Sequence, residues 1–411
     1  MKLFTFFRAL SLASLVGITS GVSASIFLVL LNKATLFRES HPFLIWGLPL
    51  AGLFIGWIFN RFGKGAEKGS NLVIEQIEGT FSSTPATLPG RMAPLVLGGT
   101  LVTHFFGGSA GREGTAVQMG ASLADQWAAF FHVTPGERKK LLIAGAGSGF
   151  GAAIGAPWAG VIFGLEMLRI GPLRFEGLTA SFIASWVAFG VTHFLKVPHS
   201  IYPSPEVPPL ATQGILVSAL VGVFFGFVAL SFSRATHLFE HFWEKLGVSV
   251  RLRPFWAGFL LILLFYLEGS ERYAGLGISV IQESLILPGH WEDGLWKFLF
   301  TVVTIGSGFK GGEFIPLVFI GTCLGSSFSH LPFFSYLSFD ILGALGFAAV
   351  FGAASNTPLA CFVMALELFG VSLWPYALVA CFFAYWASGH RGIYQSQSVS
   401  RHKLFFLKKP F

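Results

Sequence analysis

Charged residues are scarce in this sequence. Asp, Glu, Lys and Arg together make up 11% of the 411 residues, against roughly 25% in an ordinary soluble domain. Hydrophobic residues make up 53%, and the mean hydropathy is +0.69. A chain with so few charged side chains to cover its apolar surface is not a soluble globular domain. The sequence therefore predicts an integral membrane protein whose main partner is the lipid bilayer.

Cysteine is also rare. The three cysteines, Cys323, Cys361 and Cys381, all lie in apolar stretches and show no CxxC spacing. This pattern indicates neither a disulfide framework nor a zinc site. No metal-ligand spacing occurs elsewhere in the sequence, and we expect no metal and no cofactor.

Acidic residues are fewer than basic ones, 20 against 27, so the formal net charge is +7. The basic residues lie in loops and tails beside apolar segments, and we therefore expect no nucleic-acid partner. Residues 391–411 contain no acidic residue and five basic ones: Arg391, Arg401, Lys403, Lys408 and Lys409. The excess of basic residues predicts a cytoplasmic C-terminus, in what we expect to be a bacterial inner (plasma) membrane.

The apolar residues are spread over the whole chain rather than gathered in one anchor. Several stretches approach the ~20 residues that cross a bilayer, and shorter ones are tolerated where they line a cavity or are buried in protein. The stretches are 7–32, 43–60, 92–106, 140–168, 174–195, 213–233, 255–267, 296–306, 316–330, 341–353 and 357–388. They predict an all-α polytopic membrane protein with many short and tilted helices.

The first apolar stretch resembles a signal peptide, because Lys2 and Arg8 precede or open it. Its apolar run continues to Leu31, past any plausible cleavage point. We therefore favour a retained helix.

An internal repeat divides the chain. Phe-Gly-Ala-Ala at 150–153 recurs 201 positions later at 351–354, and the same shift takes Pro157 and Glu166 onto Pro358 and Glu367. Three further matches, in the same order in both halves, pair 111–113 with 311–313, Gly120 with Gly321, and 73–76 with 280–283. The chain therefore consists of two homologous halves.

The proposed domain boundaries follow from this repeat. Residues 1–196 form the first half and 215–396 the second, and 397–411 form a basic tail. Between the halves, 197–214 contains five prolines and predicts an extended connector. In transporters built from repeats, the binding site lies near the middle of the membrane, where broken helices of both halves meet.

One glycine-rich motif, Gly-Gly-Ser-Ala-Gly-Arg-Glu-Gly-Thr at 107–115, precedes an apolar helix expected from about Ala116. Free N–H groups and the positive end of such a helix form an anion site. Glu113 can occupy that site when it is ionised and leave it when protonated, which couples anion entry to proton uptake. The alternative is a structural ion pair between Arg112 and Glu113 at the membrane interface.

Two further motifs have the same form. Residues 308–316 contain Glu313 and open another apolar helix, and Gly69, Ser70 and Asn71 open a third. Three helix N-termini at one locus predict an anion cradle. Tyr394, after the last apolar stretch, is expected either to donate a hydrogen bond to the anion or to anchor the membrane interface.

Taken together, Gly-Arg-Glu-Gly at 111–114, Gly-Gly-Glu-Phe-Ile-Pro at 311–316 and the paired segments ending in Glu166 and Glu367 resemble the CLC family of chloride channels and anion/proton antiporters. The resemblance covers nearly the whole chain. It implies an inverted repeat of two halves, about eighteen membrane-inserted helices, and a homodimer with one pathway per subunit. It makes Glu113 the gating glutamate and Tyr394 the central tyrosine. The candidate anion-binding residues are Gly69, Ser70, Asn71, Gly111, Arg112, Gly114, Thr115, Phe314, Ile315 and Tyr394.

Within this family, the motifs resemble the fluoride-exporting branch. Residues 69–73 read Gly-Ser-Asn-Leu-Val instead of Gly-Ser-Gly-Ile-Pro, and Thr115 replaces a proline. Met167 stands where proton-coupled chloride exchangers carry an additional glutamate, so that Glu313, which the fluoride branch shares, becomes the candidate for inner proton transfer. Against this, Phe314 and Ile315 replace the valine and threonine of that branch, and the threonine hydroxyl is implied to help bind the ion.

The resemblance predicts fluoride/proton antiport that exports fluoride. A chloride channel or a chloride/proton exchanger of the same family is the alternative. A distant alternative is an intramembrane serine hydrolase, because residues 107–111 match a nucleophile-elbow pattern around Ser109, with His104 or His193 as a base. That pattern needs a strand-to-helix turn and a triad, so we expect a transporter and not an enzyme.

Overall fold

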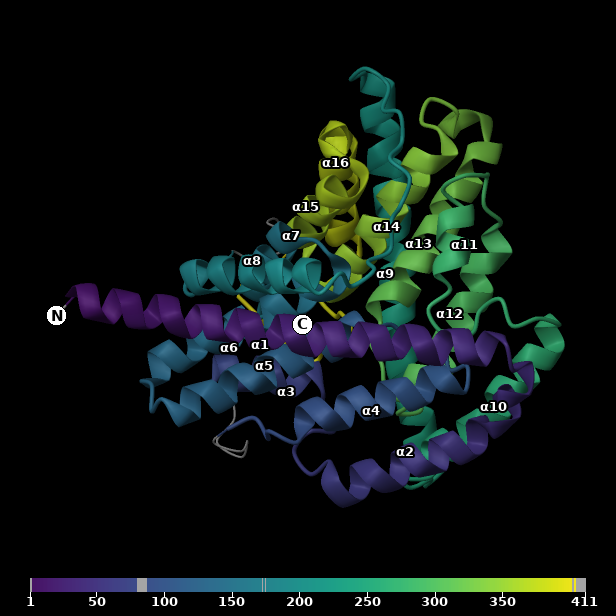
Figure 1. The fold of residues 1–411 in the computed structure, drawn as a ribbon. Helices are drawn as coiled ribbons and strands as arrows, with labels where there is room; N and C mark the ends of the chain where they lie inside the picture. Colours follow the sequence, from purple (N-terminus) through teal and green to yellow (C-terminus); the bar gives the residue numbers. More distant parts are fainter. Residues whose placement is uncertain (1, 80–86, 172, 174, 401–402, 404–411) are drawn as a thin grey trace.

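The structure is a computed structural model that describes residues 2–79, 87–171, 173, 175–400 and 403. Within this part the chain forms sixteen α-helices, four short 3-10 helices and two strands of two residues each (Figure 1). The helices before the connector are α1 (Lys2–Glu39), η1 (Pro42–Gly47), α2 (Leu48–Phe62), α3 (Ser70–Glu78), α4 (Met92–Phe105), α5 (Glu113–Phe130), α6 (Pro135–Ile154), α7 (Pro157–Glu166) and α8 (Leu178–Phe194).

The helices after the connector are α9 (Thr212–Lys245), α10 (Arg253–Glu268), α11 (Ile278–Glu283), α12 (Trp291–Gly306), α13 (Phe314–Ser327), η2 (Phe328–His330), η3 (Pro332–Phe334), α14 (Phe339–Ser355), α15 (Pro358–Phe369), η4 (Val371–Leu373) and α16 (Trp374–Ala387). Eight α-helices therefore precede residues 195–211, which form no helix or strand, and eight follow them.

The predicted all-α membrane fold is confirmed. Three segments are long and apolar enough to cross a bilayer: Phe7–Glu39, Pro42–Phe62 and Thr212–Lys245. The other apolar helices are shorter, and α13, α14 and the part of α6 from Leu141 to Ile154 are almost entirely buried inside the protein. Short helices of this kind are stable in a membrane because other protein segments cover them. The three cysteines are free and buried.

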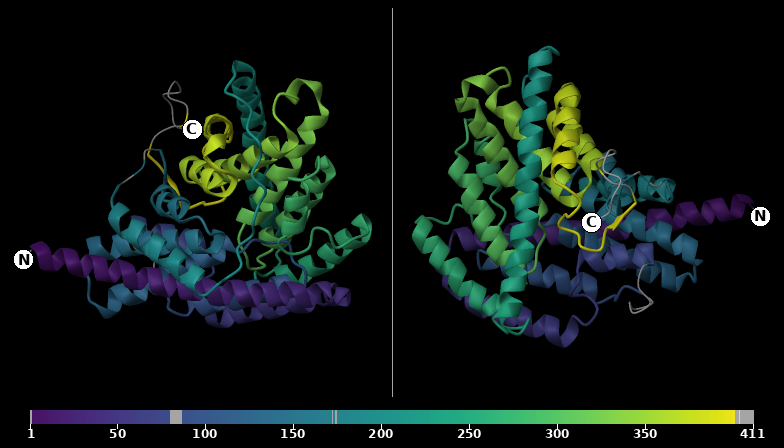
Figure 2. Two further views of the ribbon diagram at one scale, coloured as in Figure 1. Left: turned by 45° about the horizontal axis from the view of Figure 1, so that its top comes forward. Right: turned by 180° about the vertical axis from the view of Figure 1, so that it is seen from behind.

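Helix α1 runs across one side of the molecule and packs closely against α8 (Figures 1 and 2). A Cβ added at Gly17 would lie 2.6 Å from the carbonyl oxygen of Ala184, and one at Gly21 would lie 2.8 Å from that of Ala188. Small residues allow this close approach of two helices in a membrane. The stretch that resembled a signal peptide is thus packed into the helical bundle.

The two halves cap each other's helices. The carboxylate of Glu166, at the end of α7, accepts hydrogen bonds from the N–H groups of Leu359 (3.1 Å) and Ala360 (2.8 Å) at the start of α15. Glu367, at the end of α15, accepts the equivalent pair from the start of α7, at 2.9 and 2.8 Å. Each carboxylate satisfies two otherwise unpaired donors and lies at the positive end of a helix.

The repeated Phe-Gly-Ala-Ala segments also meet. The rings of Phe150 in α6 and Phe351 in α14 are stacked with centroids 6.2 Å apart, and the ring of Phe314 lies edge-on to both. Residues related by the 201-residue shift are therefore in contact at the centre of the molecule. Such contacts are what a pseudo-twofold relation between the halves requires.

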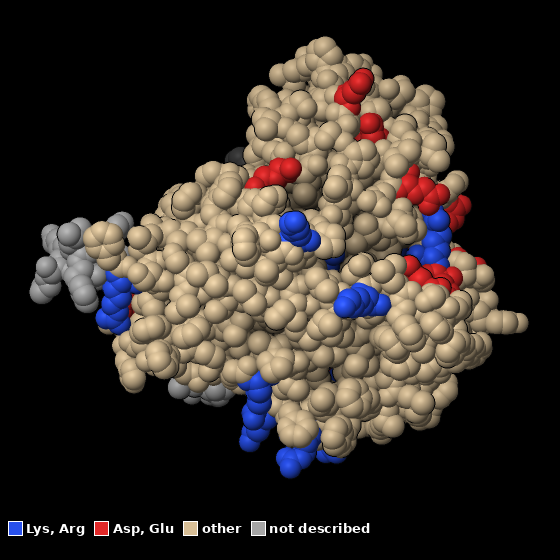
Figure 3. Space-filling model, viewed as in Figure 1, with Lys and Arg blue, Asp and Glu red and all other residues tan. Residues whose placement is uncertain are grey.

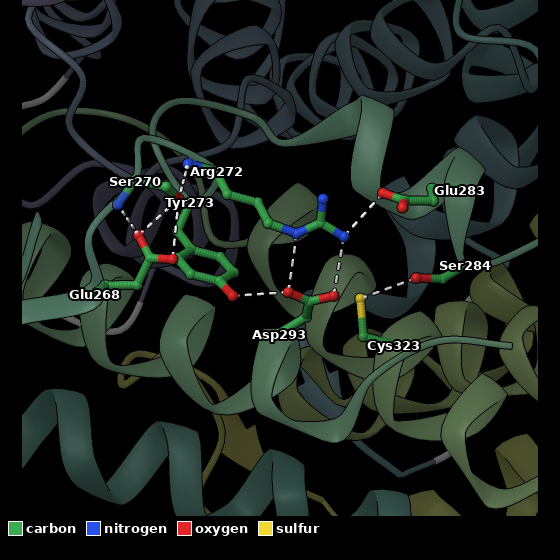
Figure 4. A network of polar contacts seen from close by, with 8 residues as sticks. All are labelled: Glu268, Ser270, Arg272, Tyr273, Glu283, Ser284, Asp293 and Cys323. Carbon is green, nitrogen blue, oxygen red and sulfur yellow. Dashed lines mark hydrogen bonds and ion pairs between the residues drawn. The ribbon is translucent and has the colours of Figure 1, made fainter. Parts of the chain in front are cut away.

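The loop between α10 and α11 is fixed by a polar network (Figure 4). The guanidinium of Arg272 binds the carboxylate of Asp293 at 3.0 and 3.1 Å and that of Glu283 at 2.8 Å. The hydroxyl of Tyr273 donates to Asp293 at 2.7 Å. The buried ammonium of Lys297 donates to two carbonyl oxygens of the same loop, those of Tyr273 and Gly275. The network holds this loop against α11 and α12.

The chain beyond α16 returns along the first half. Strand β2 (Ser398–Val399) pairs in parallel with β1 (Arg169–Ile170), which follows α7, and Figure 2 shows this segment beside the first half. Of the basic residues predicted for the tail, Arg391 and Lys403 are described, whereas Arg401, Lys408 and Lys409 lie outside the described residues.

Candidate functional site

The two glycine-rich motifs that match each other in the repeat are hydrogen-bonded to each other. The N–H of Gly312 donates to the carbonyl of Gly111 at 2.8 Å, and the N–H of Gly111 donates to the carbonyl of Gly312. A Cβ at Gly312 would lie 2.7 Å from the backbone nitrogen of Gly114. Only glycine permits this approach, which brings the N-termini of α5 and α13 together.

Glu113 is the first residue of α5, and its carboxylate is buried at this junction, 1% exposed. It accepts hydrogen bonds from the backbone N–H of Arg112 at 3.1 Å and from Nε of the same residue at 3.2 Å. Arg112 also donates to the hydroxyl of Ser200 at 3.3 Å. The predicted ion pair thus exists, but it is buried inside the protein and does not lie on an exposed interface.

Two cavities are lined by residues close to Glu113 in the sequence. The smaller cavity, about 480 Å³, is lined by Thr115, two residues after Glu113, and also by Gly311 and Glu313. The larger cavity, about 1140 Å³, is lined by Arg112. Glu113 itself lines neither cavity. The carboxylate is therefore buried outside both cavities, next to Arg112 of the larger one.

Most of the predicted anion-binding residues that face a cavity face the smaller one: Gly69, Ser70, Asn71, Thr115 and Tyr394. Gly69 and Ser70 open α3, so the N-terminus of a third helix also reaches this space. Tyr394 is 7% exposed and belongs to the cavity wall, not to an outer belt of aromatic residues.

The other predicted anion-binding residues do not line the smaller cavity. Arg112 lines the larger one, and Gly111 and Gly114 lie at the glycine junction. Phe314 and Ile315, in the first turn of α13, are buried, with 2% and 1% of their surface exposed. Phe314 belongs to the aromatic contact between the halves.

The side chain of Asn71 has a fixed orientation. Its Oδ1 accepts a hydrogen bond from the backbone N–H of Ser396 at 3.0 Å. The NH₂ group of the same amide is therefore the end that remains for the cavity, and it is a donor. The hydroxyl of Ser396 in turn donates to Glu75 at 2.9 Å. The segment that carries Tyr394 thus also orients Asn71.

Several residues of the smaller cavity were not predicted. Gln118 donates to the hydroxyl of Ser70 at 3.3 Å, and the charged and polar part of the wall also includes Lys68, His237, Glu240, Lys310 and Gln395. Lys310 lies within the predicted motif 308–316 and Lys68 directly precedes Gly69, so their positions were a usable signal. Gln118 and His237 are polar residues within apolar helices, a pattern that marks functional positions in membranes.

The serine-hydrolase alternative has no matching geometry. The buried hydroxyl of Ser109 pairs with the hydroxyl of Thr301 at 2.9 Å, and helix α4, not a strand, precedes its loop. Neither ring nitrogen of His104 has a hydrogen-bond partner within the described part of the chain. The described residues also contain no group of three His, Cys, Asp or Glu side chains placed to hold a metal ion.

A family model described as "Voltage gated chloride channel" matches residues 51–389 of this chain. The chain belongs to the voltage gated chloride channel family. The family resemblance predicted from the motifs is therefore confirmed.

Relatives within this family differ in the ions that their names give. A "Chloride/fluoride channel protein" of Pseudomonas syringae pv. tomato is 42% identical over 400 residues, which cover 96% of this chain and 87% of the relative. An "H(+)/Cl(-) exchange transporter ClcA" of Yersinia pestis is 27% identical over 397 residues. The aligned region covers 87% of this chain and 80% of the relative.

Solved structures of the family agree with the fold. The structure of a "CLC-type fluoride/proton antiporter" is 32% identical, with a TM-score of 0.91 over 97% of this chain and 99% of the other. The structure of a "slow cyanobacterial Cl-/H+ antiporter" has a TM-score of 0.82 over 94% of this chain and 96% of its own. At 22% identity the latter supports the fold alone.

Proposed function

We propose that this protein is a fluoride/proton antiporter that exports fluoride, with Glu113 as its proton-linked gate. The observation that carries the proposal is the position of the Glu113 carboxylate, buried at the joined N-termini of α5 and α13, with Arg112 on the larger cavity and Thr115 on the smaller one. The names of the 42% identical relative and of the 32% identical antiporter structure support the choice of ions.

The gate acts by competition for one site. An ionised Glu113 is held by Arg112 and by backbone donors, so it fills the place where a halide would be stabilised by the same groups. A protonated carboxyl group loses most of this attraction and is free to leave. The anion then passes the junction, and its return requires the proton to be released.

The smaller cavity supplies donors for a small, strongly hydrated anion. The NH₂ group of Asn71 and the hydroxyl groups of Ser70 and Tyr394 replace part of the hydration shell. Glu313, on the same cavity, exchanges the proton. Chloride/proton exchange is the second candidate, because buried Ile315 offers no hydroxyl group where the fluoride branch has one.

We also propose that the smaller cavity opens to the cytoplasm of a bacterial cell. Its wall includes Glu67, Glu75, Glu240 and Glu313, but the helix ends and loops near it are basic: Arg61, Lys64, Lys68, Arg91, Lys245, Arg251 and Arg253. The wall of the larger cavity includes Glu39 and Glu271 together with Arg38, Arg112 and Arg272, and Glu268 and Glu283 lie on the segments beside it. Figure 3 shows lysine and arginine side chains projecting along the lower edge and acidic side chains higher on the same face. The positive-inside rule gives the orientation.

A homodimer is proposed as the working unit. Large aromatic side chains of α7 and α8 are exposed together, because Trp158 (48%) contacts both Phe182 (41%) and Trp186 (37%). Such a surface is suited to a second copy within the bilayer. Light scattering in detergent is expected to give twice the subunit mass of 44.5 kDa, and a single-subunit mass at all concentrations would contradict the proposal.

Efflux from proteoliposomes tests the function. Vesicles loaded with fluoride are expected to release fluoride faster when a proton gradient directed inward is imposed. Vesicles loaded with chloride are expected to release chloride more slowly than the first vesicles release fluoride. Protein-free vesicles give the leak. Fluoride release that ignores the proton gradient would indicate a channel, and faster chloride release would indicate the chloride exchanger.

A further inference from the structure

Helix α9 presents an ionisable pair to the smaller cavity. Thr236, His237 and Glu240 all line it, together with Glu313 of the second motif. Nδ1 of His237 lies 3.6 Å from Oε2 of Glu240, one turn further along the helix. Both side chains are partly exposed, 29% and 41%, so water in the cavity reaches them. The mechanism above gives this pair no role.

The hydrogen bonds of His237 define its protonation chemistry. Nε2 lies 3.2 Å from the carbonyl oxygen of Gly392 and must donate, because a carbonyl oxygen only accepts. Nδ1 lies 2.9 Å from the amide nitrogen of Gln395 and accepts a hydrogen bond from it. The neutral ring therefore carries its proton on Nε2, and its Nδ1 lone pair accepts the hydrogen bond from Gln395, which also lines the cavity.

A second proton must bind at Nδ1. The protonated Nδ1 can no longer accept the hydrogen bond from the Gln395 amide, and its new N–H needs an acceptor. The Glu240 carboxylate is within reach. Both protein groups that orient the ring, Gly392 and Gln395, belong to the segment that carries Tyr394. Protonation of His237 thus changes a hydrogen bond to Gln395, the residue that follows the predicted central tyrosine.

The charges that surround His237 favour a protonated ring. Glu240 faces it from α9, and Glu313 from the loop before α13. Of the basic groups in the cavity, Lys68 is paired with Glu75 at 2.9 Å, and the ammonium of Lys310 lies over the ring of Phe59 at 4.4 Å. Glu67 adds a further carboxylate to the wall.

We propose that His237, with Glu240 as its counter-ion, is the site that exchanges protons between cytoplasmic water and Glu313. When fluoride is exported, the proton leaves the Glu313 carboxyl group through cavity water, binds Nδ1, and is released to cytoplasmic water, which leaves His237 neutral for the next cycle. Histidine suits this role because its charge changes near physiological pH. The inference rests on the proposed antiport and adds the route by which protons leave Glu313.

The same helix provides a matched control. His241 and Glu244 form a second histidine–glutamate pair with the same spacing of three residues, at 2.7 Å, but their side chains are 69% and 52% exposed and do not line the cavity. A role for any surface histidine of α9 would affect both pairs equally. The proposal predicts an effect at His237 alone.

The test measures fluoride efflux and proton uptake in proteoliposomes for wild type, His237→Ala and His241→Ala. In His237→Ala the coupled flux is expected to fall by about tenfold at neutral pH, because a positioned proton shuttle is lost. Imidazole added to the buffer is expected to restore much of it by occupying the space of the missing ring. The coupled flux of His241→Ala is expected to equal that of the wild type. Added imidazole is expected to change neither of them.

Three results would overturn the proposal: wild-type flux in His237→Ala, equal losses in both variants, or a loss that imidazole does not restore. Glu240→Gln keeps the ring and is expected to move the pH dependence of the coupled flux to lower pH; an unchanged pH profile would also overturn it. If Glu313→Gln abolishes proton movement while His237→Ala behaves as wild type, this inference fails and the antiport stands. A wild-type protein without proton-coupled flux would instead remove the proposed function.

Discussion

The proposed antiport mechanism depends on the carboxylate of Glu113. It is the first residue of α5, buried, and held by two donors of Arg112. A buried ion pair is retained only if its charges are well compensated, and removing one charge changes the balance strongly. In the proposed mechanism, the charge of this side chain therefore decides whether it remains at the helix N-termini.

Glu113→Gln is expected to uncouple the two ions. The amide is neutral at every pH and imitates the protonated gate, so fluoride flux should continue and lose its response to an imposed proton gradient. Efflux measured with a fluoride electrode at several gradients checks this. Glu137→Gln, in the exposed capping box at the start of α6, is the control and should keep the coupling of the wild type. Normal coupling in Glu113→Gln would remove Glu113 from its role.

Ile315→Thr tests the departure from the fluoride branch. Threonine adds a hydroxyl group in the first turn of α13, next to the glycine junction. A hydrogen bond from it is worth about 0.5–1.5 kcal/mol, so the preference for fluoride over chloride should rise by a factor of about 2–10. The ratio of the two efflux rates gives the answer. Ile320→Thr, equally buried on the same helix, should leave the ratio unchanged.

At the residue scale, sequence reasoning found the residues that stand in glycine-rich motifs. Asn71, Glu313 and Tyr394 do line one cavity, as a shared site requires. It did not find Gln118 or His237, because a single polar residue in a helix has no local pattern that tells which neighbours it will meet. Their partners, Ser70 and Gln395, come from distant parts of the chain.

At the scale of elements, the junction between the two motifs depends on backbone contact. Gly111 and Gly312 exchange two hydrogen bonds, and the starts of α5 and α13 converge because no side chain keeps them apart. The sequence predicted that helix N-termini would meet. It did not predict a hydrogen-bonded bridge, since pairing between loops depends on how the two halves are docked.

Gly312→Ala is expected to destabilise the protein. The new methyl group would lie 2.7 Å from the nitrogen of Gly114, and overpacking of this kind costs about 1–3 kcal/mol. Thermal unfolding in detergent should show a lower midpoint and fluoride flux should fall. Gly98→Ala, in the middle of α4 with no atom within 4 Å of the added carbon, is the control and should be neutral or slightly stabilising. Equal midpoints for the two variants would show that the junction is not closely packed.

At the scale of the whole molecule, the repeat was the most informative feature of the sequence. The shift of 201 positions predicted that Glu166 and Glu367 are equivalent, and the structure places them in equivalent caps. That each caps the helix of the other half was not predictable, because sequence similarity gives correspondence without relative placement. The number of helices was close to expectation: sixteen α-helices are described where about eighteen were expected.

The two cavities and the charge distribution are properties of the assembled halves. Residues from both halves line each cavity. In the assembled molecule, we therefore expect a fluoride gradient and a proton gradient to exchange free energy through one gate.

Uphill proton movement tests that claim most directly. Proteoliposomes with equal pH on both sides and a fluoride gradient directed outward, with the membrane potential clamped by a potassium ionophore, are monitored with a pH-sensitive dye. The account predicts that fluoride leaving the vesicles drives protons inward until a pH gradient forms, and that Glu313→Gln abolishes this movement. Fluoride efflux with no change of internal pH beyond that of protein-free vesicles would contradict it.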